Sequence, residues 1–174
     1  MMASADGTES GGWAERVERL ARLVPGLGKY QDREGLRDAD KRIRTYVAEL
    51  LGNLGRELEP AQRRLTEERR LDRLTALDRL GRQLITLADR TRFASYGFAG
   101  VFAAHKIREA ELAALHAFDV RLVEEIPRLQ VLLKTVAEAT RRDDGFADTV
   151  RAAEDGLRRF EETLDERDRL ARGL

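Results

Sequence analysis

Cysteine is absent from this chain of 174 residues, and histidine and proline are scarce. Without cysteine the chain has no disulfide, no thiolate ligand for a metal and no cysteine nucleophile. The two histidines, His105 and His116, are too few for a His-rich metal site. With only 3 prolines and 14 glycines, the chain holds few residues that end helices, so we expect few loops.

The charges balance, with 32 Lys and Arg against 32 Asp and Glu. A general nucleic-acid-binding protein needs a surplus of basic residues, so we expect no nucleic-acid partner. The longest uncharged run, residues 93–104, falls short of the roughly 20 residues that span a bilayer. Residues 1–12 show no apolar leader. We therefore expect a cytoplasmic protein, with the inner face of the membrane as an alternative location.

Nearly all of the chain has the apolar spacing of amphipathic helices. Hydrophobic residues recur at alternating steps of three and four, which places them on one face of a helix. These apolar stripes run over residues 13–24, 36–54, 74–88, 112–136 and 146–164. Pro60 favours a break after the second stripe, with a continuation to Leu65 as the alternative, and Pro127 predicts a kink in the fourth stripe.

This spacing is a heptad seam, and short connections between helices imply antiparallel neighbours. We therefore predict an all-α fold: an elongated antiparallel helical bundle of four long helices plus a short N-terminal helix, with coiled-coil-like packing. A disordered N-terminal tail is expected over residues 1–12 and a single helical-bundle domain over residues 13–174. Phe160 is expected in the core. Asp40, Arg44 and the charged run 165–169 are expected on solvated helical faces.

The sequence carries none of the common catalytic or cofactor motifs. A ferritin-like metal site needs Glu-x-x-His on two helices, but Ala113 stands three residues before His116 and Phe102 three before His105. No glycine-rich loop has phosphate-binding spacing. His116 follows Leu115 and is expected to be half-buried at the edge of the seam. We expect no catalytic residue, no metal and no cofactor, and an all-α enzyme is the least favoured function.

The segment 93–104 differs from the rest of the chain, because it holds four of the ten aromatic residues and no charge. Three interpretations stay open: the rings close the end of the bundle, they form a surface for a partner or for self-association, or they insert shallowly into a membrane interface. The residues that we propose for such a contact are Tyr96, Phe98 and Phe102. Phe98 lies between two glycines and is expected to face outward.

The function that the sequence favours is a non-catalytic helical scaffold or adaptor that acts through protein–protein interaction. No motif specifies the protein partner, and heptad seams also allow a homo-oligomer. The alternative is a peripheral membrane-associated helical protein, of the kind used in envelope stress or membrane remodelling, that uses the segment 93–104. Its membrane-surface contact would be weak, because Asp89, Glu109 and Glu111 dilute the basic residues that flank the segment.

Overall fold

The computed structural model describes residues 9–27, 33–94, 109–142 and 144–173. Helices hold 91% of them, and none of these described residues lies in a strand. The helices are α1 (Glu9–Leu23), α2 (Arg33–Glu67), α3 (Leu71–Phe93), α5 (Glu109–Ala139) and α6 (Phe146–Gly173). The predicted all-α bundle, with four long helices and a shorter N-terminal one, is confirmed.

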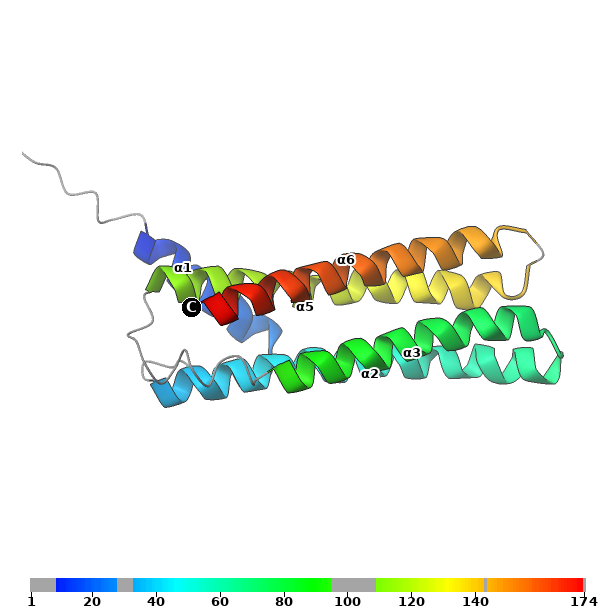
Figure 1. Cartoon of the computed structure of the whole chain (residues 1–174), viewed down its shortest axis with the longest axis horizontal. Helices are drawn as coiled ribbons and strands as arrows, with labels where there is room; N and C mark the ends of the chain where they lie inside the picture. Colours follow the sequence, from blue (N-terminus) through cyan, green and yellow to red (C-terminus); the bar gives the residue numbers. More distant parts are fainter. Residues whose placement is uncertain (1–8, 28–32, 95–108, 143, 174) are drawn as a thin grey trace, which may run out of the picture.

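The four long helices form two antiparallel hairpins that lie side by side in an elongated bundle (Figure 1). α2 packs along α3, α5 packs along α6, and the two hairpins meet chiefly where α2 contacts α5. The turns of both hairpins lie at one end of the bundle, which we call the turn end. α1 packs on α5 toward the opposite end, where the chain also finishes.

The hydrophobic core continues along α2 past its proline, because Leu58, Ala61 and Leu65 are all buried. Pro60 lies inside an unbroken helix, so the expected break at this position is wrong and the continuation to Leu65 is correct. A proline removes one backbone hydrogen bond of a helix. Burial of the apolar side chains on both sides of it holds this stretch helical nonetheless. α5 likewise continues through Pro127.

The turn between α2 and α3 has the hydrogen bonds of a Schellman motif. The N–H of Arg70 donates to the carbonyl of Leu65 at 2.9 Å, and the N–H of Arg69 donates to the carbonyl of Thr66 at 3.2 Å. Arg69 has a φ of +56°, a left-handed conformation that normally belongs to glycine. In the turn between α5 and α6 the left-handed conformation falls on a glycine, as is usual, since Gly145 has a φ of +80°.

α5 and α6 approach each other closely at Gly156. A Cβ at this glycine would lie 2.7 Å from Cδ1 of Leu132 and 3.1 Å from Cδ2 of Leu129. One turn further along α6, Phe160 is completely buried, which confirms its predicted place in the core. Close packing of this hairpin therefore requires a small residue at position 156 and a large ring one helical turn later, at position 160.

Candidate functional site

The most unusual group of side chains is an ion network buried in the bundle at the end opposite the turns. Its centre is Arg167 of α6, which is 0% exposed. Nε of Arg167 donates to Oδ1 of Asp119 in α5 at 2.5 Å. Its Nη2 donates to Oδ1 of Asp40 in α2 at 2.6 Å. One guanidinium thus joins carboxylates from two other helices.

Two further residues extend this network to all four long helices. Nε of Arg44 donates to Oδ2 of Asp40 at 2.9 Å, and its Nη1 donates to the carbonyl of Arg92 in α3 at 2.7 Å. Nδ1 of His116 lies 3.0 Å from Oδ2 of Asp119. Because an ionised carboxylate only accepts hydrogen bonds, the histidine nitrogen is the donor.

The charges of the network hold one another in the ionised state. Burial alone would raise the pKa of Asp119, but the Arg167 guanidinium and the hydrogen bond from His116 more than offset it, so the pKa lies below its ordinary value. Burial would likewise lower the pKa of Arg167, yet the carboxylates of Asp119 and Asp40 raise it above its ordinary value. Asp119 and Arg167 therefore hold each other in the charged state inside the core.

The network corrects three expectations from the sequence. Asp40 and Arg44 are each 5% exposed rather than solvated, His116 is buried rather than half-buried, and Arg167 is the central buried charge of a run expected to be solvated. The signal was present in the spacing: the buried positions Phe160, Leu164, Arg167 and Ala171 step by four, three and four. Arg167 therefore occupies a seam position, where its charge can be buried only with partners.

At the turn end of the bundle, a second set of arginines donates hydrogen bonds to Thr140 and its neighbour. Nη1 of Arg73 donates to the carbonyls of Ala139 at 3.3 Å and of Thr140 at 2.9 Å. Nη1 of Arg70 donates to the same Thr140 carbonyl at 3.0 Å, and Nη2 of Arg64 donates to its hydroxyl at 2.6 Å. These cations satisfy the last carbonyls of α5 and suit the negative end of its helix dipole.

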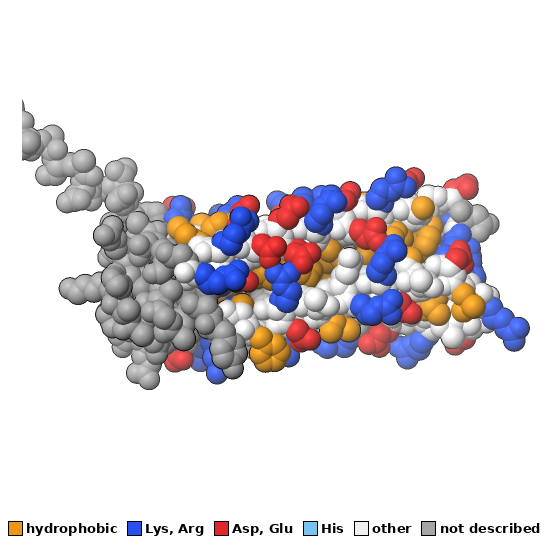
Figure 2. All heavy atoms as spheres, in the orientation of Figure 1, with side chains coloured by type: hydrophobic (Ala, Val, Ile, Leu, Met, Phe, Trp, Pro, Cys, Tyr) orange, Lys and Arg blue, Asp and Glu red, His pale blue; other side chains and the backbone are white. Residues whose placement is uncertain are grey.

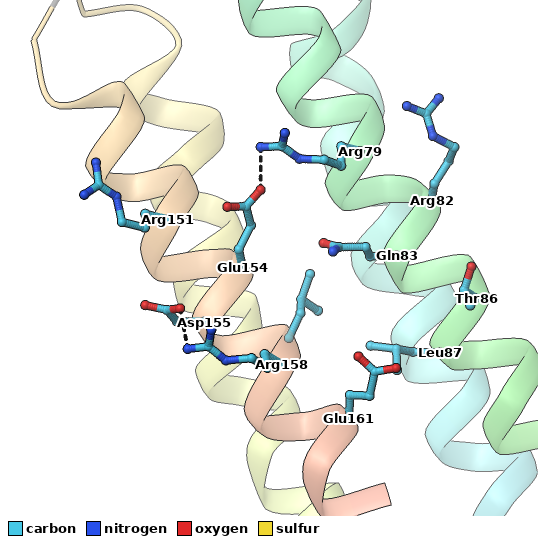
Figure 3. Close-up of a pocket in the computed structure, with 11 residues that line it drawn as sticks. Arg79, Arg82, Gln83, Thr86, Leu87, Arg151, Glu154, Asp155, Arg158 and Glu161 are labelled. Atoms are coloured by element: carbon cyan, nitrogen blue, oxygen red, sulfur yellow. Dashed lines mark hydrogen bonds and ion pairs between the residues drawn. The ribbon is translucent and has the colours of Figure 1, made fainter. Parts of the chain in front are cut away.

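The bundle surface offers a groove of about 690 Å³ between α3 and α6. Leu87 and Leu157 form its buried floor, and charged side chains from both helices stand along its sides (Figure 3). Arg79 pairs with Glu154 across the groove, and Nη2 of Arg158 lies 2.7 Å from Oδ1 of Asp155. The basic lining residues are Arg79, Arg82, Arg151 and Arg158, and the acidic ones are Glu154, Asp155 and Glu161.

Arg82 is the one basic residue of this groove that makes no ion pair with any described residue. Among the described residues Arg151 pairs with Asp148 alone, at 3.3 Å, and both of those side chains are well exposed. The groove therefore carries positive charge that the chain itself neutralises weakly. Figure 2 shows the setting: basic and acidic side chains intermingle along the bundle, with small apolar areas between them.

The sequence-predicted contact residues Tyr96, Phe98 and Phe102 lie outside the described residues. Of the aromatic rings in the segment 93–104, the described part contains only Phe93, which is 64% exposed at the end of α3. No described helix is long and apolar enough to cross a membrane. Within residues 9–27, 33–94, 109–142 and 144–173, no three His, Asp or Glu side chains are grouped so as to hold a metal ion.

Comparison of the chain with family models, with curated proteins and with solved structures gave no match. The ion network is closed between four packed helices, and its residues are at most 5% exposed. The groove between α3 and α6 is open to solvent and presents charge, so it is the better candidate for contact with another molecule.

Proposed function

We propose that this protein is a non-catalytic helical scaffold or adaptor that binds an acidic segment of a partner protein in the groove between α3 and α6. The observation that carries the proposal is Arg82, a groove-lining guanidinium without an ion pair among the described residues. A carboxylate of the partner would supply a counter-ion that the described residues of one chain do not. Protein–protein recognition of this kind needs no catalytic group.

The form of the groove supports a peptide rather than a small molecule as the partner. It runs between two long helices and has Leu87 and Leu157 at its floor, with charges along both sides. An elongated peptide can lay apolar side chains toward such a floor and charged ones toward the rims. Because Arg82 has no ion pair among the described residues and Arg151 is only weakly paired, these two arginines would also speed the encounter with an acidic partner at low salt.

Peripheral membrane association is a second candidate function, and the exposed ring of Phe93 favours it. The neighbouring cation Arg90 is already paired with Glu161 and Asp165 of α6. That pairing reduces the positive charge available for anionic lipid, which is why we place this function second. Flotation with anionic vesicles tests it: the full chain should float, and Phe93→Ser should reduce the floating fraction.

The groove proposal is tested by photo-crosslinking in the native host. A photoreactive amino acid at Thr86, which lines the groove, is expected to capture a partner, whereas the same group at Val131, exposed on α5, is expected not to capture it. The double variant Arg82→Glu with Arg151→Glu should then lose that partner, because it reverses both weakly paired charges. The matched control is Arg128→Glu, a charge reversal on α5 at a side chain about as exposed as that of Arg151.

Equal capture at Thr86 and Val131, or a partner retained by the double variant, would contradict the proposal. The fold serves as an internal check, since all three arginines are surface residues and each variant should keep its helical circular dichroism.

A further inference from the structure

A separate groove of about 430 Å³ lies between α2 and α3. It differs from the groove of the proposed function, although Arg82 stands on the rim of both. Three glycines, Gly52, Gly55 and Gly81, make it deep, and Ile85 stands beside them with 59% of its surface exposed. Most large aliphatic side chains of the described helices are buried, so an exposed isoleucine beside glycines indicates a contact surface.

The glycines leave room for an incoming side chain. A Cβ built at Gly55 meets nothing within 4 Å, and one at Gly52 meets only Nη1 of Arg56, at 3.9 Å. Gln62 of α2 donates to Oδ1 of Asp78 in α3 at 2.8 Å, which aligns the two antiparallel helices. Seven residues from this pair on each helix, Gly55 lies level with Ile85. The protruding side chain of Ile85 and the hollow at Gly55 thus lie at the same level along the bundle axis.

The rims of this groove carry four charges: Arg56, Glu59, Asp78 and Arg82. Two are basic and two acidic, and none of them makes an ion pair with a described residue. By the same alignment Glu59 lies near the level of Arg82. A surface with equal numbers of both signs, and no ion pair to another described residue, is electrically complementary to itself rather than to a strongly acidic or basic partner.

We propose that a second copy of this chain docks on the α2–α3 groove, with the twofold axis parallel to the bundle. This symmetry sets α3 of each copy against α2 of the other at the same height. Ile85 of one copy then enters the hollow at Gly52 and Gly55 of the other, and Arg82 meets the Glu59 of the second copy. Each contact occurs twice, and one patch supplies both the protrusion and the hollow, as an isologous interface requires.

The first experiment is sedimentation velocity of the full chain over a concentration series. The wild type is expected to dimerise, and Gly55→Gln is expected to raise the dissociation constant by about tenfold or more because it fills the hollow. The variant keeps its fold, since the position is open in the monomer and glutamine is a better helix former than glycine. A wild type that stays monomeric at hundreds of micromolar overturns the proposal.

The second experiment exchanges charges between copies. Arg82→Glu alone and Glu59→Arg alone should each weaken self-association by about tenfold or more, since each places like charges together twice. A mixture of the two variants should regain the affinity of the wild type, because both pairs across the interface become opposite in sign again. A mixture no tighter than the single variants overturns the arrangement.

Crosslinking locates the contact independently, because the native chain has no cysteine. Gly55→Cys mixed with Ile85→Cys, under mild oxidation, should give a disulfide between differently tagged copies. Gly55→Cys mixed with Val131→Cys is the control, since Val131 is similarly exposed but lies on α5. Equal yields in the two mixtures would contradict the proposed contact. Neither the hollow nor these cysteines touch the α3–α6 groove, so this result is distinguishable from that of the partner experiment.

Discussion

Replacing Arg167 with methionine tests how much the buried ion network contributes to stability. Methionine fills much of the volume of the arginine without its charge, so Asp40 and Asp119 lose the cation that they share. Removing one partner of a buried ion pair typically costs about 3–5 kcal/mol, because the remaining charge is left uncompensated. Arg44 still pairs with Asp40, so we expect a loss near the lower end, about 3 kcal/mol.

A loss of this size is readily measured by thermal unfolding. For a chain of this length, 1 kcal/mol corresponds to roughly 2–4 °C in the melting temperature, so Arg167→Met should melt roughly 6–12 °C below the wild type. Far-ultraviolet circular dichroism follows the transition, because nearly all of the described chain is helical. The control is Arg169→Met, the same change two residues along α6 at an exposed position, with an expected effect within about 0.5 kcal/mol.

The dependence on pH gives a signature that simple loss of packing would not. In the wild type the pKa of Asp119 is lower folded than unfolded, because Arg167 and the hydrogen bond from His116 outweigh burial. Its contribution to stability is therefore full above the unfolded-state pKa of about 3.9 and is lost as the pH falls through the folded-state pKa. In Arg167→Met burial dominates and should raise the folded-state pKa above the unfolded one.

Acidification toward pH 4 should then change the stability of the variant and not the Asp119 contribution of the wild type, which stays full down to about pH 3.9. Between about pH 7 and pH 4 the stability of Arg167→Met relative to the wild type should recover, since protonating the buried carboxylate removes the uncompensated charge. Urea unfolding at a series of pH values measures this difference directly. A variant as stable as the wild type at neutral pH, or a deficit that does not shrink on acidification, would refute the reasoning.

The remaining predictions concern backbone conformation and packing. Arg69→Gly should stabilise the protein by up to about 1 kcal/mol, because glycine accepts the positive φ without strain. Arg63→Gly, on the exposed face of α2, should instead cost about 0.5–1 kcal/mol. Urea unfolding that gives the same sign for both variants would contradict this. Gly156→Ala should cost about 1–3 kcal/mol through overpacking, and Gly55→Ala should gain about 0.5–1 kcal/mol in the monomer; thermal melts at low concentration compare them. Phe160→Ala should cost about 3–5 kcal/mol, and an unchanged melt would mean that α6 contributes little to the core.

The fold was predictable because side chains buried on one face of a helix recur in the sequence at steps of three and four. Each apolar stripe found in this way corresponds to one helix of the structure. The predicted helix break at Pro60 was wrong because it considered only the local cost of a proline in a helix. A proline removes one hydrogen bond, but Leu58, Ala61 and Leu65 bury their side chains against a neighbouring helix. That tertiary contribution does not appear in the residues next to the proline.

The candidate site was less predictable, because its members come from distant parts of the chain. Nothing near Arg167 in the sequence indicates that Asp40 and Asp119 will neutralise it. The heptad position of Arg167 was the available signal, and the run of charges around it hid that signal. Grooves between helices are also not encoded in any local motif, since they depend on how closely two helices pack.

The separation of the network residues along the chain has a consequence for folding. Asp40 and Arg167 are 127 positions apart, whereas each hairpin is built from helices that are adjacent in sequence. Local contacts form early and distant ones late, because closing a long loop costs more entropy. The two hairpins therefore assemble first, and their docking completes the network. Until then the network is divided, with Asp40 and Arg44 in one hairpin and Asp119 and Arg167 in the other. Each half then presents an ion pair on its apolar face without the contact between Asp40 and Arg167. Half of the bundle should therefore gain little stability alone, and unfolding of the four helices should be one cooperative event.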